Sequence, residues 1–162
     1  MSAAPSATLR AAGPDEDWAA IRALVLRAFA VMDGRIDPPS SLARWDAGTF
    51  AETVRDGCGF VAVEGARPVG FVAGTVEDGA LYLGKLAVDP DRRGRGIARG
   101  LIDMAAAEAA RRGLPRLRLK CRIEMVETQA AFRAMGFSET GRSAHPGFDR
   151  ATSVTIERAV AN

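Results

Sequence analysis

Two glycines and four arginines lie together in the segment Arg92-Arg93-Gly94-Arg95-Gly96-Ile97-Ala98-Arg99. The segment follows an apolar stretch typical of a strand and opens an apolar pattern typical of a helix. Such a turn directs several unpaired backbone N–H groups at one point, where the helix dipole adds about half a positive charge. Gly94 and Gly96 lack the side chains that would keep a ligand away from the backbone. The segment therefore predicts a site for a phosphate-bearing ligand.

The arginines favour the same interpretation. Each cation at the positive end of a helix is disfavoured by about 0.3–1 kcal/mol. A bound polyanion would make the electrostatic energy of these arginines favourable, so their presence indicates a functional site. Two alternatives are a basic turn that only caps a core helix and a surface that binds nucleic acid. The chain has 22 basic and 20 acidic residues, a net charge of +2, which disfavours a protein held mainly by nucleic-acid phosphates.

Two familiar phosphate motifs do not fit the segment. The pattern G-x-x-x-x-G-K-[ST] of nucleoside triphosphatases is absent. A dinucleotide fold would place its glycines after the first strand and an acidic residue about 20 positions later. Here several expected strands precede the glycines, and residues 116–122 are basic.

Hydrophobic periodicity predicts the elements that position the segment. We expect strands near residues 8–10, 60–63, 69–76, 81–88, 117–121, 137–142 and 153–159, and helices near 15–32, 42–55, 96–112 and 128–135. Turn signals at 65–68 and 78–79 indicate that three of these strands form an antiparallel meander. This order predicts a mixed α/β (α+β) domain.

Two local features refine this arrangement. Gly84 interrupts the strand before the arginine-rich turn and predicts a β-bulge that opens its edge. Residues 33–41 contain two prolines and predict a stiff surface loop. That loop is either a rigid connector or a wall of a substrate site.

Length and composition exclude several classes of protein. The 162 residues favour one domain, 1–162, with residues 1–7 disordered. Two cysteines and one histidine disfavour a disulfide framework and a metal site. No apolar run approaches the roughly 18 residues of a membrane span, and no secretory signal is visible. We expect a cytoplasmic protein with no metal, membrane or nucleic-acid partner.

The segment and its context resemble the GNAT-type N-acetyltransferases. Residues 93–98 fit that family's [RQ]-x-x-G-x-[GA] pyrophosphate loop, after the usual strand Leu86-Ala87-Val88 and Asp89-Pro90. Residues 130–137, Ala-Ala-Phe-Arg-Ala-Met-Gly-Phe, resemble its second signature. The expected element order agrees over about residues 7–160. The resemblance implies a GNAT-like, mostly antiparallel sheet of about six to seven strands flanked by about four helices.

The resemblance also implies acetyl-CoA as the co-substrate. The amides of Arg93, Gly94, Arg95, Gly96, Ile97 and Ala98 would hold the pyrophosphate of coenzyme A. Leu86, Ala87 and Val88 would pair with the pantetheine arm like an added strand and supply an N–H group to the thioester carbonyl. Phe132 would pack beside the cofactor.

The sequence departs from the family at its usual catalytic positions. The tyrosine that protonates the departing thiolate is replaced by Phe132, and the asparagine seven residues earlier by Met125. A thiolate, whose thiol pKa is about 8.5, can leave without a dedicated acid. Some members carry a glutamate eleven residues before the loop, and here that residue is Tyr82, expected to hold a water. Glu124 and Glu77 are rival carboxylates for proton transfer.

In this family, the loop that contains His145 and the first inter-helix loop commonly border the acceptor cleft. We therefore take His145, Arg35 and Asp37 as candidate acceptor-binding residues. For His145, a hydrogen bond that stiffens a Pro-Gly turn is the alternative. Cys58 and Cys121 are expected to be buried, inert thiols.

The function expected from this resemblance is direct transfer of the acetyl group of acetyl-CoA to an amine of a small molecule or peptide. A non-catalytic acyl-CoA-binding or regulatory module of the same fold is the alternative, because Phe132 replaces the expected acid. An exposed edge strand would permit a homodimer.

Overall fold

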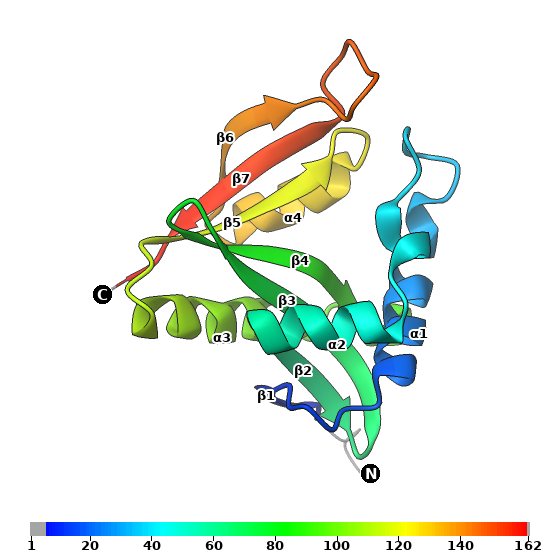
Figure 1. Cartoon of the computed structure of the whole chain (residues 1–162), viewed down its shortest axis with the longest axis vertical. Helices are drawn as coiled ribbons and strands as arrows, with labels where there is room; N and C mark the ends of the chain where they lie inside the picture. Colours follow the sequence, from blue (N-terminus) through cyan, green and yellow to red (C-terminus); the bar gives the residue numbers. More distant parts are fainter. Residues whose placement is uncertain (1–5, 162) are drawn as a thin grey trace.

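A seven-stranded sheet runs through the molecule in the order β1-β2-β3-β4-β5-β7-β6 (Figure 1). The structure is a computed structural model, and it describes residues 6–161. Every neighbouring pair of strands is antiparallel except β4 and β5, which are parallel. The expected mixed, mostly antiparallel sheet is therefore confirmed. Its strands are β1 (Thr8–Ala11), β2 (Cys58–Glu64), β3 (Arg67–Glu77), β4 (Ala80–Val88), β5 (Arg116–Arg122), β6 (Ser138–Ser143) and β7 (Ser153–Ala159).

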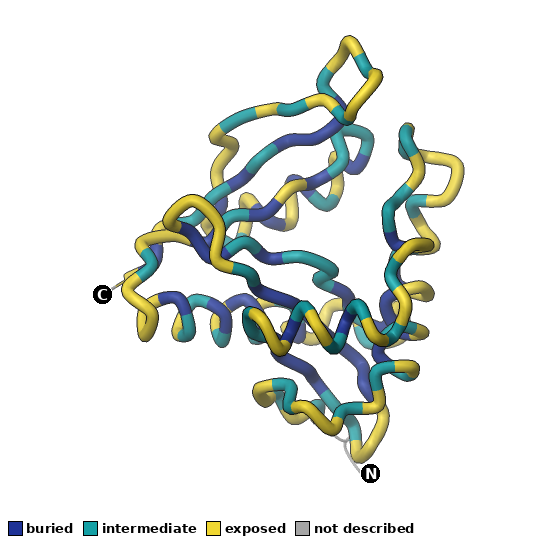
Figure 2. The backbone as a smooth tube through the Cα atoms, in the orientation of Figure 1, coloured by how far each residue is buried: buried dark blue, intermediate teal, exposed yellow. Residues whose placement is uncertain are grey.

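Four α-helices cover the two faces of this sheet. Helices α1 (Trp18–Phe29) and α2 (Ala47–Asp56) pack against one face, in a hydrophobic cluster that includes Phe71. Helices α3 (Ile97–Arg111) and α4 (Val126–Ala134) contribute to the cluster on the other face, which includes Val72. Alternate residues of a strand point to opposite faces, so neighbouring residues of β3 belong to different clusters. Figure 2 shows the central strands buried and the outer sides of the helices exposed.

Local hydrogen bonds set the beginning of α1 and α2. Asp17 caps α1, because its carboxylate accepts from the N–H of Ala20 at 3.0 Å. The continuous helix expected at 42–55 is wrong. Residues Ser41–Arg44 form a 3₁₀ turn, and α2 begins at Ala47 because the Asp46 carboxylate accepts from the N–H of Thr49 at 2.8 Å.

Strands β4 and β5 separate soon after they meet. Their ladder contains the pairs Leu81–Leu117 and Tyr82–Arg118. Beyond Tyr82, β4 pairs with β3 alone, so one edge of its second half is open. Figure 1 shows the two strands diverging beyond this short ladder.

The expected bulge in β4 lies one residue after Gly84. Gly84 pairs with Ala73, and Ala87 pairs with Phe71, so β4 has one residue more than β3 between these pairs. Lys85 takes the extra position with φ +55°, a left-handed conformation that costs a non-glycine residue about 1–3 kcal/mol. Gly84 is therefore not the bulged residue, since it keeps its place in the ladder.

The amino-terminal prediction of disorder falls partly on residues 1–5, which lie outside the described residues. Ala7 is described and packs against the core cluster that contains Val72. Among the described residues, no helix is both long enough and apolar enough to cross a bilayer.

Candidate active site

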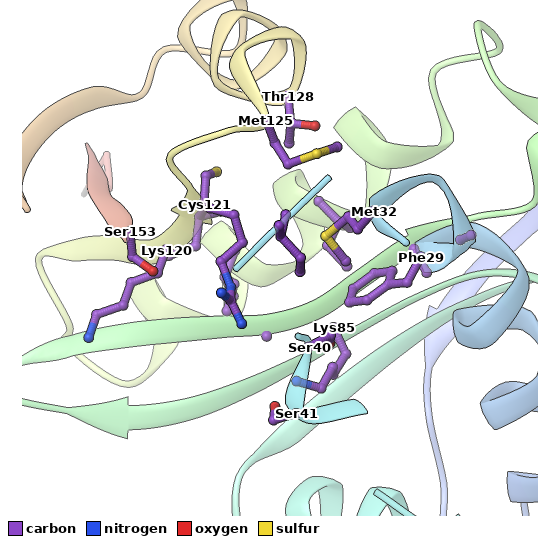
Figure 3. A pocket seen from close by; sticks show the side chains of 18 of the residues that line it. Phe29, Met32, Ser40, Ser41, Lys85, Lys120, Cys121, Met125, Thr128 and Ser153 are labelled. Carbon is purple, nitrogen blue, oxygen red and sulfur yellow. The ribbon is translucent and has the colours of Figure 1, made fainter. Parts of the chain in front are cut away.

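A cleft of about 1390 Å³ lies between the diverging strands β4 and β5. Its walls come from the end of α1, the loop before α2, β3, β4, β5, α4 and the loop between β6 and β7. Figure 3 shows side chains from these separate segments pointing toward one another, among them Phe29, Met32 and Met125. The cleft therefore joins both halves of the sheet.

The turn before α3 has the geometry expected of an anion site. Gly94 and Gly96 take φ values of +80° and +78°, which are allowed for glycine at little cost. Gly96 caps α3 in the left-handed conformation without a side-chain hydrogen bond. Among the described residues, no protein acceptor pairs with the backbone N–H groups of residues 93–99. These donors are available to a ligand, and Arg93 and Ala98 line the cleft.

Two of the four arginines at this turn are engaged within the protein. Arg92 pairs with Glu64 at 2.9 Å, and Arg93 donates to the carbonyl of Ala28 at 3.2 Å. Arg95 and Arg99 are exposed and form no ion pair with the described residues. The turn therefore presents a smaller free charge than the sequence indicates.

The open edge of β4 leads from this turn toward the middle of the cleft. Ala87 and the adjacent Val88 pair with β3 on one side, whereas the β5 ladder ends at Tyr82 on the other. Leu86, Ala87 and Val88 all line the cleft. A strand edge of this kind can pair with an extended ligand through its backbone groups.

Tyr82 lies at the point where β4 and β5 separate, and it lines the cleft. Burial raises the pKa of its phenol, and the charges of Glu77 and Cys121 raise it further. Tyr82 is therefore a neutral hydroxyl at pH 7, a group that can hold a water but is a poor base. Glu77 lines the same cleft.

Phe132 and Met125 both line the cleft from the side of α4. Phe132 is buried and packs edge-on against Phe137, with 5.5 Å between the ring centroids. Met125 is also buried and precedes α4 without a side-chain cap. Neither side chain can donate a proton.

The loop of residues 33–41, named here the strap, is tied to the other half of the molecule. Arg35 pairs with Glu127 of α4 at 2.6 Å, and Asp37 pairs with Arg150 of the β6–β7 loop at 3.2 Å. Arg35 and Asp37 are not among the residues that line the cleft. Because Arg35 contacts α4 and Asp37 contacts the β6–β7 loop, the strap bridges the two halves of the molecule.

Glu124 and Arg122 extend this bridge. One carboxylate oxygen of Glu124 accepts from the N–H of Asp37 at 3.1 Å, while its other oxygen is buried without a partner. Glu124 does not line the cleft. Arg122 donates to the carbonyl oxygens of Pro38 and Pro39 at 2.7 and 3.1 Å. Glu124 therefore contacts the strap directly, and its role in proton transfer stays a prediction.

His145 lines the cleft from the β6–β7 loop. Its Nδ1 contacts the hydroxyl of Thr152, and its backbone N–H donates to the same oxygen at 2.8 Å. Burial lowers the pKa of the imidazole, and the charges of Arg122 and Lys120 lower it further. The ring is thus predominantly neutral at pH 7, and both its loop-stiffening and its acceptor-facing interpretations fit this position.

Lys85 and Trp45 are site residues that the sequence interpretation missed. The ammonium of Lys85 lies 4.5 Å from the centroid of the Trp45 ring, a cation–π contact inside the cleft. Burial lowers the pKa of Lys85, and the charge of Arg122 lowers it further. The sequence feature that indicates Lys85 is a lysine next to Gly84 in an otherwise apolar strand.

The comparisons with known proteins agree with this fold and site. Residues 18–137 match the acetyltransferase (GNAT) family. A search of curated protein sequences found no match. The chain belongs to the acetyltransferase (GNAT) family and is an N-acetyltransferase.

Three solved structures have a similar fold. The ribosomal-protein-S18-alanine N-acetyltransferase from Escherichia coli is 23% identical over 96% of this chain and 95% of its own, with a TM-score of 0.73. The PaiA N-acetyltransferase from Thermoplasma acidophilum, solved in complex with coenzyme A, is 13% identical over 95% and 99%, with a TM-score of 0.77. A GNAT acetyltransferase from Staphylococcus aureus is 15% identical over 96% and 100%, with a TM-score of 0.76. At these identities the likeness concerns the fold.

Proposed function

We propose that this acetyltransferase binds acetyl-CoA across the cleft and transfers its acetyl group directly to an amine. The observation that carries the proposal is the run of unpaired backbone N–H groups at residues 93–99, aligned with the open edge of β4. The N–H groups of residues 93–98 would hold the pyrophosphate. Leu86, Ala87 and Val88 would pair with the pantetheine arm and polarise the thioester carbonyl. Phe132 would pack beside the thioester.

The transfer requires a neutral amine. Its nitrogen attacks the thioester carbon, a C–N bond forms, the C–S bond breaks, and coenzyme A leaves as a thiolate. The nitrogen loses a second proton as it becomes an amide, and the departing thiolate takes up that proton to give the free thiol. An alkylammonium group has a pKa near 10.4, so its proton has to be removed first. We propose that the neutral hydroxyl of Tyr82 orients the water that accepts this proton. A thiolate is a tolerable leaving group, which is consistent with Phe132 in place of an acid.

The acceptor is proposed to be an amine of a small molecule or a peptide, bound in the part of the cleft near Lys85, Lys120 and His145. The protein is proposed to act in the cytoplasm, because both cysteines are free thiols in the structure. We propose no metal in the reaction. Within the described residues, no cluster of metal-ligating side chains was found.

Replacement of Gly96 by alanine tests the cofactor site. The Cβ would meet no protein atom within 4 Å, but it would strain the left-handed backbone and narrow the approach to the N–H groups. We expect the affinity for coenzyme A, measured by calorimetric titration, to fall at least about tenfold, equivalent to about 1.4 kcal/mol.

The matched control is Gly79→Ala in the turn between β3 and β4. Gly79 has φ +74°, close to the +78° of Gly96, and its Cβ would also meet open space. Both variants are expected to lose similar thermal stability, but only Gly96→Ala is expected to lose coenzyme A affinity. Equal affinity in the two variants contradicts the proposed phosphate site. Binding without release of coenzyme A thiol in the presence of any amine would favour the non-catalytic module.

A further inference from the structure

The walls of the cleft carry basic side chains that form no ion pair with the described residues. On β5, alternate residues Arg118, Lys120 and Arg122 face the side of the sheet that α1 and α2 cover, because Leu117, Leu119 and Cys121 lie in the opposite cluster. Arg118 is neutralised by Glu157 at 2.8 Å. Lys120 and Arg122 line the cleft and form no ion pair with the described residues.

Lys85 lies on β4, across the cleft from Lys120 and Arg122 of β5. The β-bulge gives Lys85 its left-handed backbone, and its ammonium lies over Trp45 with no carboxylate in ion-pair range among the described residues. Arg122 repels it, as the lowered pKa of Lys85 indicates. A left-handed lysine, partly buried near another cation, is costly for the free protein. Such a cost is typical of functional positions.

The acidic residues nearby form no ion pair with Lys85, Lys120 or Arg122 among the described residues. Glu127 is paired with Arg35, and Asp37 is paired with Arg150. Glu124 acts favourably on Arg122 through its charge, but it accepts from the N–H of Asp37 and does not line the cleft. Glu77, at the far end of β3, is the remaining carboxylate in the wall of the cleft. The positive potential of Lys85, Lys120 and Arg122 therefore favours an anion in this part of the cleft.

The strap limits the size of what can enter. Its contacts with Glu127, Arg150 and Arg122 connect the α1 side of the cleft to α4 and to the β6–β7 loop. These contacts hold the strap across one side of the cleft, which leaves less room for an extended peptide than for a short molecule.

From these observations we infer that the acceptor is a small amine that carries an oxyanion, a carboxylate or phosphate, and that Lys85 binds this oxyanion. The inference rests on the proposed transfer reaction and names its substrate class. Lys120 and Arg122 supply additional positive potential from β5. The ammonium of Lys85 would then exchange its contact with Trp45 for a charge-assisted hydrogen bond. The bulge at Lys85 places this cation next to Leu86, Ala87 and Val88, the proposed thioester site.

The test uses matched amines with the thiol-release assay. One arm contains α-, β- and γ-amino carboxylates together with the amides and methyl esters of the same molecules. A second arm contains the corresponding aminoalkyl phosphates, which separates a phosphate acceptor from a carboxylate. We expect kcat/KM for the preferred anionic amine to exceed that of its neutral counterpart at least about tenfold, the effect of one charged hydrogen bond.

Two variants assign the effect to Lys85. We expect Lys85→Met to lower kcat/KM for the anionic amine about 10- to 100-fold, mainly through KM, and to change the neutral counterpart less than about threefold. Lys85→Arg is expected to retain much of the preference. Coenzyme A affinity, measured by titration, is expected to be unchanged in both, which also shows that they fold.

The outcomes separate the inference from the proposed function. If coenzyme A does not bind wild-type protein, the proposed function fails and the inference with it. If coenzyme A binds but neutral or cationic amines are preferred, the inference alone is overturned. If coenzyme A binds and no amine of the panel is acetylated, the inference is overturned and the non-catalytic module is favoured over the proposed transfer. An equal loss for anionic and neutral amines in Lys85→Met also overturns it, because that result indicates a general structural role.

Discussion

The hydroxyl of Tyr82 is neutral, lies at the cleft and makes no hydrogen bond to the described residues. Its pKa is raised by burial and by the charges of Glu77 and Cys121, so the hydroxyl stays protonated across the neutral range. A residue of this kind contributes by orienting a water molecule and not by accepting a proton. Its proposed role is therefore small in energy but specific in position.

We expect Tyr82→Phe to lower kcat about fivefold to tenfold, the cost of one lost hydrogen bond of about 1 kcal/mol, and to leave coenzyme A affinity unchanged. The control is Thr75→Val, which alters the cross-strand neighbour of Tyr82 on the same face. Steady-state kinetics with the best amine of the panel provides the measurement. An unchanged kcat in Tyr82→Phe would remove Tyr82 from the proton path.

At the scale of the element, close contact between β3 and α3 positions the phosphate turn. A Cβ on Gly70 would lie 2.7 Å from the Ile97 side chain and 3.1 Å from that of Leu101. Ile97 is the first residue of α3, directly after the turn. The absence of a side chain at Gly70 thus allows the first turn of α3 to rest on the sheet.

Replacement of Gly70 by alanine is expected to lower the free energy of unfolding by about 1–3 kcal/mol, the cost of overpacking a core. We also expect weaker coenzyme A binding, because the first turn of α3 has to move. The matched control is Gly141→Ala in β6, where the nearest atom to the added Cβ lies 4.0 Å away. Urea unfolding measures both variants, and a Gly70→Ala protein as stable as Gly141→Ala would contradict this packing argument.

At the scale of the whole molecule, Asp89 connects α1, β3 and the phosphate turn. The side chain is 2% exposed and contacts Arg67 at 3.0 Å and Arg27 at 3.4 Å. Burial alone would raise its pKa, but the N–H of Asp91 and the charges of Arg67 and Arg27 lower the pKa below its ordinary value. The carboxylate therefore favours the folded state when it is ionised.

The sign of the pH dependence follows from this lowered pKa. The stabilisation is present above the unfolded-state pKa of about 3.9 and is lost as the pH falls through the lower folded-state pKa. We expect Asp89→Asn to reduce the free energy of unfolding by about 2 kcal/mol at pH 7 and to reduce its dependence on pH below about 5. Asp91→Asn, at an exposed neighbouring position, is the control. Parallel acid-unfolding curves for Asp89→Asn and wild type would refute this assignment.

Local signals in the sequence were sufficient for most of the fold. The positions of the seven strands and the turn before α3 follow from alternation, helical spacing and glycine. The break before α2 was missed because Leu42 and Phe50 both become buried and suggest one apolar face, although Asp46 is the stronger local signal.

The site was less predictable than the fold, because its contacts are between residues far apart in the chain. Arg35 and Asp37 were expected at the acceptor, but their charges are taken by Glu127 and Arg150, about 90 to 110 residues away. The position of Lys85 depends on a bulge whose exact residue is set by pairing with β3. Local patterns contain no information about such pairings.

The short junction between β4 and β5 has a final consequence for cohesion. With two residue pairs in that ladder, the halves of the molecule are joined more by side chains than by peptide groups. Helix α3 lies under both halves, and its buried Leu101, Ile102 and Ala105 belong to a cluster that also contains Leu81 and Leu117. Helix α3 therefore holds the two halves together through this shared hydrophobic cluster. Slow amide exchange in α3 and faster exchange along the rim strand β6 would be the signature of that division.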